Sequence, residues 1–521
     1  MDPQTTTRPR RNPWPAAIAV MISAAMVVLD TTVVNVSLPH IAGSLSATVD
    51  EATWVLTSYL AANAVVLPIA GWLANYFGRK RLLMAVVTGF TLSSALCGMA
   101  PNLPFLIFFR VLQGTTGGGL QPLSQAVMLE EFPVEERGKA MAFWSLGIIA
   151  APILGPTLGG WITDAYSWRW VFYINLPPGI TSLVMIFLFL SDPPYIRRPV
   201  ARVDLWGLAM LAIGIGALQI MLDRGQEEDW FGSSFIVTLA LTAAILLPAF
   251  VVWELSVPDP IVHFRLLTIR TFAAGIALVT VTGFVLYGSL VLLPLFMQTL
   301  LGWTSLIAGL WTSPRGIGTA LCLPLVGYLL GKGWDGRWML AAGLLVTSLA
   351  FFGYSTMNLN SGTWNILGHQ LNQGVGMAFM FVPLTTLTMA PIPQAETGYA
   401  TSLYSVVRNI GSSMGVSFVT TWVARRSQFH QSILVAHLTP ERLEVQEFLD
   451  RARQLFRQGG SDWTTATRQA QGKLYAIVHQ QASLLSFIEV FRLMGLLFVV
   501  VIPLILLMRR VTEKGKAVVP K

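Results

Sequence analysis

Charged residues are scarce in this 521-residue chain. They make up 12% of it, against about a quarter in soluble domains, whereas hydrophobic residues make up 54% and the mean hydropathy is +0.62. These values exclude an ordinary soluble domain and favour an integral membrane protein. Only two cysteines are present, Cys97 and Cys322, and both lie inside apolar runs. We therefore expect free thiols and no disulfide framework.

Motifs of several functional classes are also missing. The chain has no Gly-x-x-x-x-Gly-Lys-Ser/Thr string, the motif that would indicate transport driven by ATP. Its six histidines show no metal-ligand spacing. We expect no metal and no cofactor. The net charge of +8 comes from basic residues between apolar runs, which indicates membrane topology and no nucleic-acid partner. A membrane enzyme, or a receptor or scaffold, is the alternative from a different class.

Apolar segments long enough to cross a bilayer recur along the chain. The first of them follows three N-terminal arginines and has no small-residue cleavage site, so we interpret it as a transmembrane helix and not as a signal peptide. We predict fourteen spans, at residues 16–38, 53–74, 82–100, 104–128, 139–162, 169–190, 205–222, 235–255, 271–297, 305–330, 338–356, 364–390, 399–424 and 484–508.

The basic residues predict the orientation of these spans. An even number of spans places both termini on one side, and the tails and loops of that side hold most of the Lys and Arg residues, which predicts cytoplasmic termini. A long loop, 425–483, then lies outside the membrane. It contains two amphipathic helical stripes, which predict a helical hairpin. The hairpin caps the outer face, offers a docking surface for a partner, or does both.

An internal repeat organises the spans. At an offset of 260 residues, Gln113 and Gly114 match Gln373 and Gly374, and several further residues match as well. We predict an N-terminal six-helix bundle in residues 1–190 and a C-terminal six-helix bundle in 261–521, the latter including the 425–483 hairpin. Two extra transmembrane helices and a linker occupy 191–260. Parallel six-span repeats are how major-facilitator transporters are built, with the substrate site at the midplane between the halves.

The loop after the second span reads "GWLANYFGRKRLL", residues 71–83. Gly71 and Gly78 permit a close helix approach and a tight turn, and Arg79 helps to hold the loop on the cytoplasmic side. The string resembles the signature of the major facilitator superfamily, Gly-x-Leu-Ala-Asp-x-x-Gly-Arg-Lys. Asn75 stands where the family usually has an aspartate that helps to latch the cytoplasmic gate, so the resemblance implies a weaker or differently partnered latch.

Further strings narrow the resemblance. "RVLQG" (110–114) puts Arg110 inside the fourth span, and "GIIAAPILGPTLGG" (147–160) looks like the antiporter motif of exporters in this superfamily. The residues of these strings that we expect to act in gating and close helix contact are Gln113, Gly114, Gly155, Pro156, Gly159 and Gly160.

"LDTTVVNVSLP" (29–39) and the long loop before the last span are similar to motifs of the fourteen-span drug:proton antiporter branch. The resemblance is closest to EmrB-like exporters of the bacterial inner membrane. It implies an all-α integral membrane fold, a periplasmic adaptor protein and an outer-membrane channel.

Asp30 interrupts the first apolar segment. A carboxylate inside the bilayer is costly and is a functional hypothesis by default. We expect it to be a proton-coupling site, since burial and a nearby arginine shift the pKa of a carboxyl group in opposite directions. The family resemblance implies that Arg110 is its partner or gate. The alternative is a structural carboxylate satisfied by a buried arginine. Whether Asp30 carries a proton, contacts a cationic substrate or does both stays open.

Residues facing a central cavity are harder to choose. Arg315 follows Pro314 and is a candidate for binding anionic or amphipathic substrates, with packing or snorkelling toward the interface as the alternative. Glu489 and Arg492, three apart in the last span, are expected to pair with each other. The full set of candidate substrate-binding residues is Asn35, Tyr59, Tyr287, Arg315, Phe379 and Arg408.

Together these features predict proton-coupled export of drugs or other amphipathic small molecules by alternating access, as the pump of a tripartite efflux system. A dedicated exporter of one metabolite, siderophore or fatty acid is the alternative. The antiporter motif and the long hairpin would have no explanation in a nutrient importer.

Overall fold

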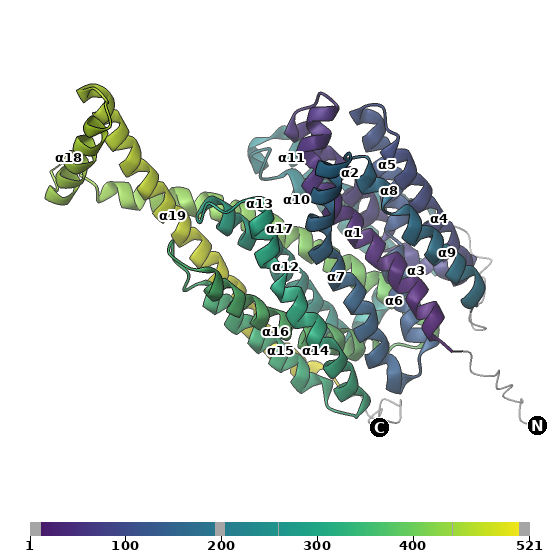
Figure 1. Cartoon of the computed structure of the whole chain (residues 1–521). Helices are drawn as coiled ribbons and strands as arrows, with labels where there is room; N and C mark the ends of the chain where they lie inside the picture. Colours follow the sequence, from purple (N-terminus) through teal and green to yellow (C-terminus); the bar gives the residue numbers. More distant parts are fainter. Residues whose placement is uncertain (1–11, 193–203, 259, 440, 510–521) are drawn as a thin grey trace, which may run out of the picture.

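The computed structural model describes residues 12–192, 204–258, 260–439 and 441–509, and all regular structure within these ranges is helical (Figure 1). The α-helices are α1 (Trp14–Ser44), α2 (Val49–Val66), α3 (Ala70–Phe77), α4 (Arg79–Gly98), α5 (Leu103–Gly117), α6 (Leu120–Glu131), α7 (Arg137–Ala165), α8 (Trp170–Tyr173), α9 (Leu176–Phe189), α10 (Leu205–Arg224), α11 (Ser234–Ser256), α12 (Arg270–Thr299), α13 (Ser305–Thr312), α14 (Pro314–Gly331), α15 (Gly336–Tyr354), α16 (Thr363–Met389), α17 (Thr397–Ala436), α18 (Leu443–Gln458) and α19 (Trp463–Val501). Short 3₁₀ segments are η1 (Val134–Glu136), η2 (Trp230–Gly232), η3 (Phe264–Thr268), η4 (Gln394–Glu396) and η5 (Ile502–Leu507). The predicted all-α class is confirmed.

Each predicted span falls on a described helix or on a broken pair of helices. The break between α2 and α3 bends the chain by 56° and contains Pro68, which cannot donate a backbone hydrogen bond. By length and hydropathy, eight described helices are suited to cross a membrane, or up to eleven when each of three bent pairs counts as one span. The predicted count of fourteen is therefore not confirmed.

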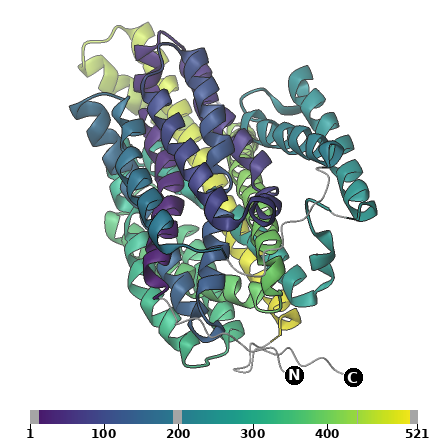
Figure 2. The same ribbon diagram turned by 90° about the vertical axis from the view of Figure 1, so that its right-hand side faces the viewer.

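The helices form two groups (Figure 1). Helices α1 to α9 pack mainly among themselves, as do α12 and α14 to α17 with α19. Helices α10 and α11 lie together as a separate pair at one side of the molecule, where α10 contacts α2 of the first group and α17 of the second (Figure 2). The domain limits 1–190, 191–260 and 261–521 stay a prediction, and most of the linker, residues 193–203, lies outside the described residues.

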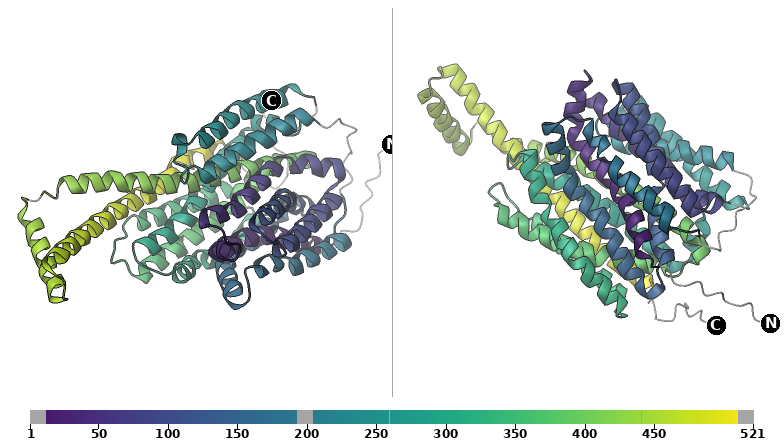
Figure 3. Two further views of the ribbon diagram at one scale, coloured as in Figure 1. Left: turned by 90° about the horizontal axis from the view of Figure 1, so that it is seen from above. Right: turned by 45° about the vertical axis from the view of Figure 1, so that its right-hand side comes forward.

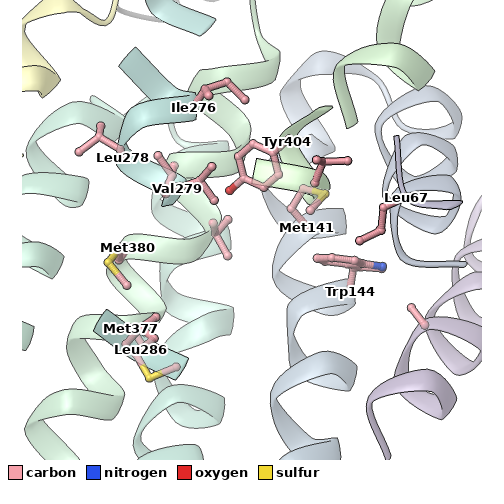
Figure 4. Close-up of a cluster of buried hydrophobic side chains, with 14 of the residues drawn as sticks. Leu67, Met141, Trp144, Ile276, Leu278, Val279, Leu286, Met377, Met380 and Tyr404 are labelled. Atoms are coloured by element: carbon pink, nitrogen blue, oxygen red, sulfur yellow. The ribbon is translucent and has the colours of Figure 1, made fainter. Parts of the chain in front are cut away.

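A continuous apolar core runs across both groups. In Figure 4, Val279 of α12 and Met380 of α16 lie on one side, Met141 and Trp144 of α7 lie on the other, and Tyr404 of α17 is placed between them. All five side chains are buried. The core therefore continues through the boundary between the helix groups.

Three helices extend beyond the bundle. The outer parts of α17 and α19 project from it, and α18 packs against α19 at the far end (Figure 3). The expected pair of Glu489 with Arg492 is wrong. Glu489 instead accepts hydrogen bonds from Arg426 of α17, at 2.6 and 2.7 Å, and lies 2.9 Å from Nε2 of His430. The carboxylate thus ties α17 to α19 at the base of the extension, because Glu489 faces the neighbouring helix and not the surface that carries Arg492.

Candidate functional site

A buried polar cluster surrounds Asp30 near the middle of α1. Its Oδ2 atom accepts a hydrogen bond from Nη1 of Arg110 at 2.6 Å, and its Oδ1 atom accepts from the side-chain amides of Gln113 at 3.0 Å and Asn175 at 2.7 Å. All four side chains are fully buried. The structure therefore brings together the predicted residues Asp30, Arg110 and Gln113, and adds Asn175 from the junction of α8 and α9.

A second layer holds these side chains in place. Ser94 of α4 accepts hydrogen bonds from Gln113 at 3.1 Å and from Asn175 at 2.9 Å. The guanidinium of Arg110 donates from Nε to the backbone carbonyl of Val55 at 3.0 Å and stacks 4.0 Å from the ring centre of Tyr59. Four helices and the α8–α9 junction thus converge on one carboxylate.

The glycines within the predicted fourth span allow α5 to approach α2 closely. Asn102 caps α5 by accepting a hydrogen bond from the backbone N–H of Phe105 at 3.1 Å, and Pro104 lies in the first turn. A Cβ atom on Gly114 would lie 2.9 Å from Cβ of Ala62 and closer still to the carbonyl oxygen of Tyr59. This close contact places Arg110 within reach of Tyr59 and of Asp30.

The glycine-rich part of α7 packs on the segment of α1 that carries Asp30. A Cβ on Gly155 would lie 2.6 Å from Cβ of Thr32, and a Cβ on Gly159 would lie 2.9 Å from the carbonyl oxygen of Val33. Gly160 has nothing within 4 Å of such an atom, so only two of the three predicted glycines make close contacts. The side chain of Pro156 lies outside what the structure describes.

The two helix groups meet tightly at the end that carries the 71–83 loop. A Cβ on Gly71 would lie 2.6 Å from the carbonyl carbon of Gly398 at the start of α17. At the same end, a Cβ on Gly138 of α7 would lie 3.0 Å from Cβ of Leu330 of α14. Backbone meets backbone at the first contact, so these helices cannot come closer. This end of the molecule is closed.

The loop itself is fixed by charged side chains. Arg79 forms an ion pair with Glu130 of α6 at 2.5 Å, and both side chains are buried. Gly78 has a φ of +90°, which favours glycine, and the backbone N–H of Lys80 donates to Asp192 at 2.8 Å. Asn75 is half-buried, and its side chain makes no hydrogen bond within the described ranges. The ion pair between Arg79 and Glu130 therefore connects this loop to α6.

The predicted substrate residues do not form one cluster. Asn35 is exposed on α1, whereas Tyr287 of α12 and Phe379 of α16 are half-buried. Tyr59 is buried beneath Arg110. Arg408 of α17 donates a hydrogen bond from Nη2 to Oε1 of Gln121 on α6 at 2.7 Å, which links the two helix groups. Arg315 is 8% exposed, and no residue in the described ranges forms an ion pair or hydrogen bond with its guanidinium.

Two cavities lie away from the Asp30 cluster. One of about 280 Å³, between α7 and α14, is lined mainly by apolar side chains with Lys139 among them. The other, of about 450 Å³, lies between α10, α12 and α17 and is lined by aromatic side chains together with Arg425 and Arg426. Both combine apolar walls with a cationic side chain, a lining suited to amphipathic molecules.

Sequence reasoning missed Asn175 and Ser94. Both are small and uncharged, and single polar residues of this size are common in apolar helices. Asn175 carried a weak signal, because it precedes Pro177 and Pro178 at a helix boundary within the span 169–190. Its contact with Asp30 depends on how α8 and α9 pack against α1, which the local sequence does not specify.

Comparisons with known proteins agree with this architecture. A family model described as the Major Facilitator Superfamily matches residues 20–416. The chain is 39% identical over 501 residues to the fatty acid resistance protein FarB of Neisseria gonorrhoeae, with 96% of each chain covered. It is 36% identical over 493 residues to the multidrug export protein EmrB of Escherichia coli, with 94% of each covered.

Solved structures show the same fold at low sequence identity. The human organic anion transporter MFSD10 matches with a TM-score of 0.59 and 13% identity, and the match covers 94% of this chain and 100% of the MFSD10 chain. The proton:xylose symporter XylE matches with a TM-score of 0.56 and 16% identity, covering 93% of this chain and 94% of its own. At these identities the likeness concerns the fold alone.

Proposed function

The chain belongs to the major facilitator superfamily, and on that basis we propose that this multi-pass membrane transporter exports drugs or other amphipathic small molecules in exchange for protons. The observation that carries the proposal is the sealed cluster around Asp30, in which one carboxylate is held by Arg110, Gln113 and Asn175. An intramembrane carboxylate with an arginine partner is typical of a proton-relay site.

The geometry of this cluster supports the proposed proton coupling. Three donors hold the carboxylate of Asp30, and Arg110 is the one among them that carries a charge. In the proposed scheme, proton binding at Asp30 accompanies the withdrawal of Arg110 from Oδ2. Because Arg110 also bonds to the backbone of Val55 and stacks on Tyr59, its withdrawal displaces α5 relative to α2. Protonation and helix position are thereby linked.

Alternating access uses the closed end. With cytoplasmic termini, the end at which Gly71 meets Gly398 is the cytoplasmic one, and the present arrangement bars substrate from that side. Both described chain ends support this assignment, since Trp14 packs on Phe132 beside the closed end and the carbonyl of Met508 accepts from Arg337. No cofactor enters this scheme, because the proton gradient supplies the energy.

In this proposal, the extension formed by α17, α18 and α19 is the surface that binds partner proteins. On the proposed topology it projects from the outer face of the bacterial inner membrane, where it would meet a periplasmic adaptor protein joined to an outer-membrane channel. The amphipathic α18 leaves Leu443 and Leu455 exposed, which supports a docking role for this extension.

A second candidate is a dedicated exporter of fatty acids. The relative from Neisseria gonorrhoeae favours it, since its name assigns resistance to fatty acids and its sequence aligns with nearly the whole chain. Multidrug export is favoured by the relatives named EmrB.

A substrate panel on inside-out vesicles tests the proposal. The vesicles carry an imposed pH gradient, acidic inside, and the panel contains cationic dyes, uncouplers, fatty acids and sugars. Export predicts that amphipathic compounds collapse the gradient faster than in vesicles without the protein, whereas sugars do not. Collapse of the pH gradient by fatty acids, and by no other compound of the panel, selects the second candidate, the fatty acid exporter. The absence of any substrate-dependent collapse contradicts proton-coupled export.

A further inference from the structure

Arg315 is a buried cation that no described residue neutralises. Its side chain is 8% exposed on α14, within the predicted tenth span, and no residue in the described ranges gives it a hydrogen bond or an ion pair. An isolated charge of this kind is costly in a membrane protein, and such residues usually face a water-filled path or a partner.

No carboxylate in the described part of the C-terminal half pairs with this arginine. From Arg270 to Arg426 the chain contains only two acidic residues, Asp335 and Glu396. Asp335 precedes α15 and pairs with Arg337 at 2.8 Å, whereas Glu396 is half-buried in η4 at the closed end. In the other half, Asp30 is already held by Arg110. Glu489 of the last span is likewise held, by Arg426 and His430. Within the described ranges, Arg315 therefore has no carboxylate partner.

The repeat shows what this place corresponds to in the N-terminal half. Gly114 contacts the carbonyl of Tyr59, and Gly374, its match in the repeat, contacts the carbonyl of Arg315 in the same way. Arg315 on α14 thus corresponds to Tyr59 on α2. By the same offset that relates the glycines, Gln370 on α16 corresponds to Arg110 on α5. The arginine of the C-terminal half thus lies on α14, the counterpart of α2, and the counterpart of Arg110 on α16 is an amide.

The remaining members of the cluster follow the same correspondence. Gln373 matches Gln113, and it bonds to Tyr354 at 3.0 Å and to Ser289 at 3.3 Å. Tyr354 matches Ser94, which bonds to Gln113. Both polar atoms of the fully buried Gln370 lack a hydrogen-bond partner within the described ranges. The second cluster thus keeps a guanidinium and amides but has no acid at its centre.

We propose that this second cluster is a subsite for an organic carboxylate, in which the substrate supplies the acid that Asp30 supplies in the first. Arg315 pairs with the carboxylate, Gln370 donates an amide hydrogen bond to it, and the apolar part of the substrate lies against the neighbouring helices. The proposal rests on the proposed transport function and names its substrate class, amphipathic monocarboxylates.

A second buried arginine adds to the positive potential of this half. Arg408 is also 8% exposed, and its partner Gln121 is neutral, so no described carboxylate balances its charge either. Two uncompensated cations facing the interior favour an anionic substrate over a cationic one.

Equilibrium binding to the purified full-length chain in nanodiscs tests this subsite. The probes are dansyl-labelled undecanoate and its uncharged methyl ester, read by dansyl fluorescence. The native chain should bind the acid at least about tenfold more tightly than the ester, the factor typical of a charge-assisted hydrogen bond. Arg315→Gln should remove this preference and retain ester binding. Lys332→Gln, which removes an exposed cation at the end of the same helix, should leave the preference unchanged.

Equal binding of acid and ester by the native chain would overturn the proposal, and so would a preference that survives in Arg315→Gln. If Arg315→Gln binds neither probe, Arg315→Lys decides, because it keeps the charge. Restored preference for the acid then supports the subsite, and its absence contradicts it. Binding at equilibrium needs no proton gradient, so a failure here is distinguishable from a failure of proton-coupled export.

Discussion

On the proposed alternating-access scheme, a single methyl group at Gly71 should shift the balance between the closed and open states of the end at which α3 meets α17. In the structure, Cβ of an alanine there would lie 2.6 Å from the carbonyl carbon of Gly398 and 2.8 Å from the backbone nitrogen of Tyr399. Both atoms belong to the backbone, so they cannot move aside as a flexible side chain would. The two helix groups must instead separate at this end.

The expected size follows from overpacking energies. Forcing an extra methyl group into a filled contact costs about 1–3 kcal/mol. On the proposed scheme the contact exists only when this end is closed. The penalty then falls on that state alone and lowers its population relative to the open state by roughly 5- to 150-fold. Gly160→Ala is the matched control, since it makes the same change in a helix where nothing lies within 4 Å.

Distances between two spin labels measure the shift. Labels at Glu135 and Lys332 flank the closed end from opposite helix groups, and both positions are exposed. Gly71→Ala should add a longer distance to the distribution, and Gly160→Ala should leave the distribution as in the parent. Identical distributions for Gly71→Ala and the parent would refute the assignment of this contact as the one that limits closure.

Two further predictions concern ion pairs. Glu130→Gln leaves Arg79 buried without its partner and should cost about 3–5 kcal/mol, read as a lower Tm; a Tm equal to that of the parent would contradict the role of this pair. Glu489→Gln should speed hydrogen exchange at the outer ends of α17 and α19, with an effect of about 0.2–1 kcal/mol since the pair is partly exposed. Arg492→Gln is the control for the second, and equal exchange in both variants would count against the pairing seen here.

The fold was largely predictable because composition and periodicity specify membrane helices. Segment lengths and the loop signature predicted an all-α major-facilitator fold, and both are confirmed. The predicted number of fourteen spans was not confirmed. Helices α5, α6, α13 and α14 are short or interrupted by glycine and proline, so the criteria of length and hydropathy do not count them as spanning helices.

The site was predictable where charge was involved. Asp30 and Arg110 stand out in apolar segments, and the structure places them in contact. The amide of Asn175 and the hydroxyl of Ser94 were not predictable, because their importance comes from tertiary packing around Asp30. The same reason explains the error at Glu489. Spacing along one helix favoured Arg492, but the neighbouring helix α17 presents Arg426 in a better position.

Proton flux in Asp30→Asn tests the central claim most directly. The purified transporter is placed in proteoliposomes with a compound that drives proton movement in the native chain, and proton flux is recorded beside exchange of labelled for unlabelled compound. We predict that Asp30→Asn loses substrate-driven proton flux and retains exchange, which also shows that the variant is folded. Equal substrate-dependent proton flux in the native chain and in Asp30→Asn would contradict the assignment of Asp30 as the coupling residue.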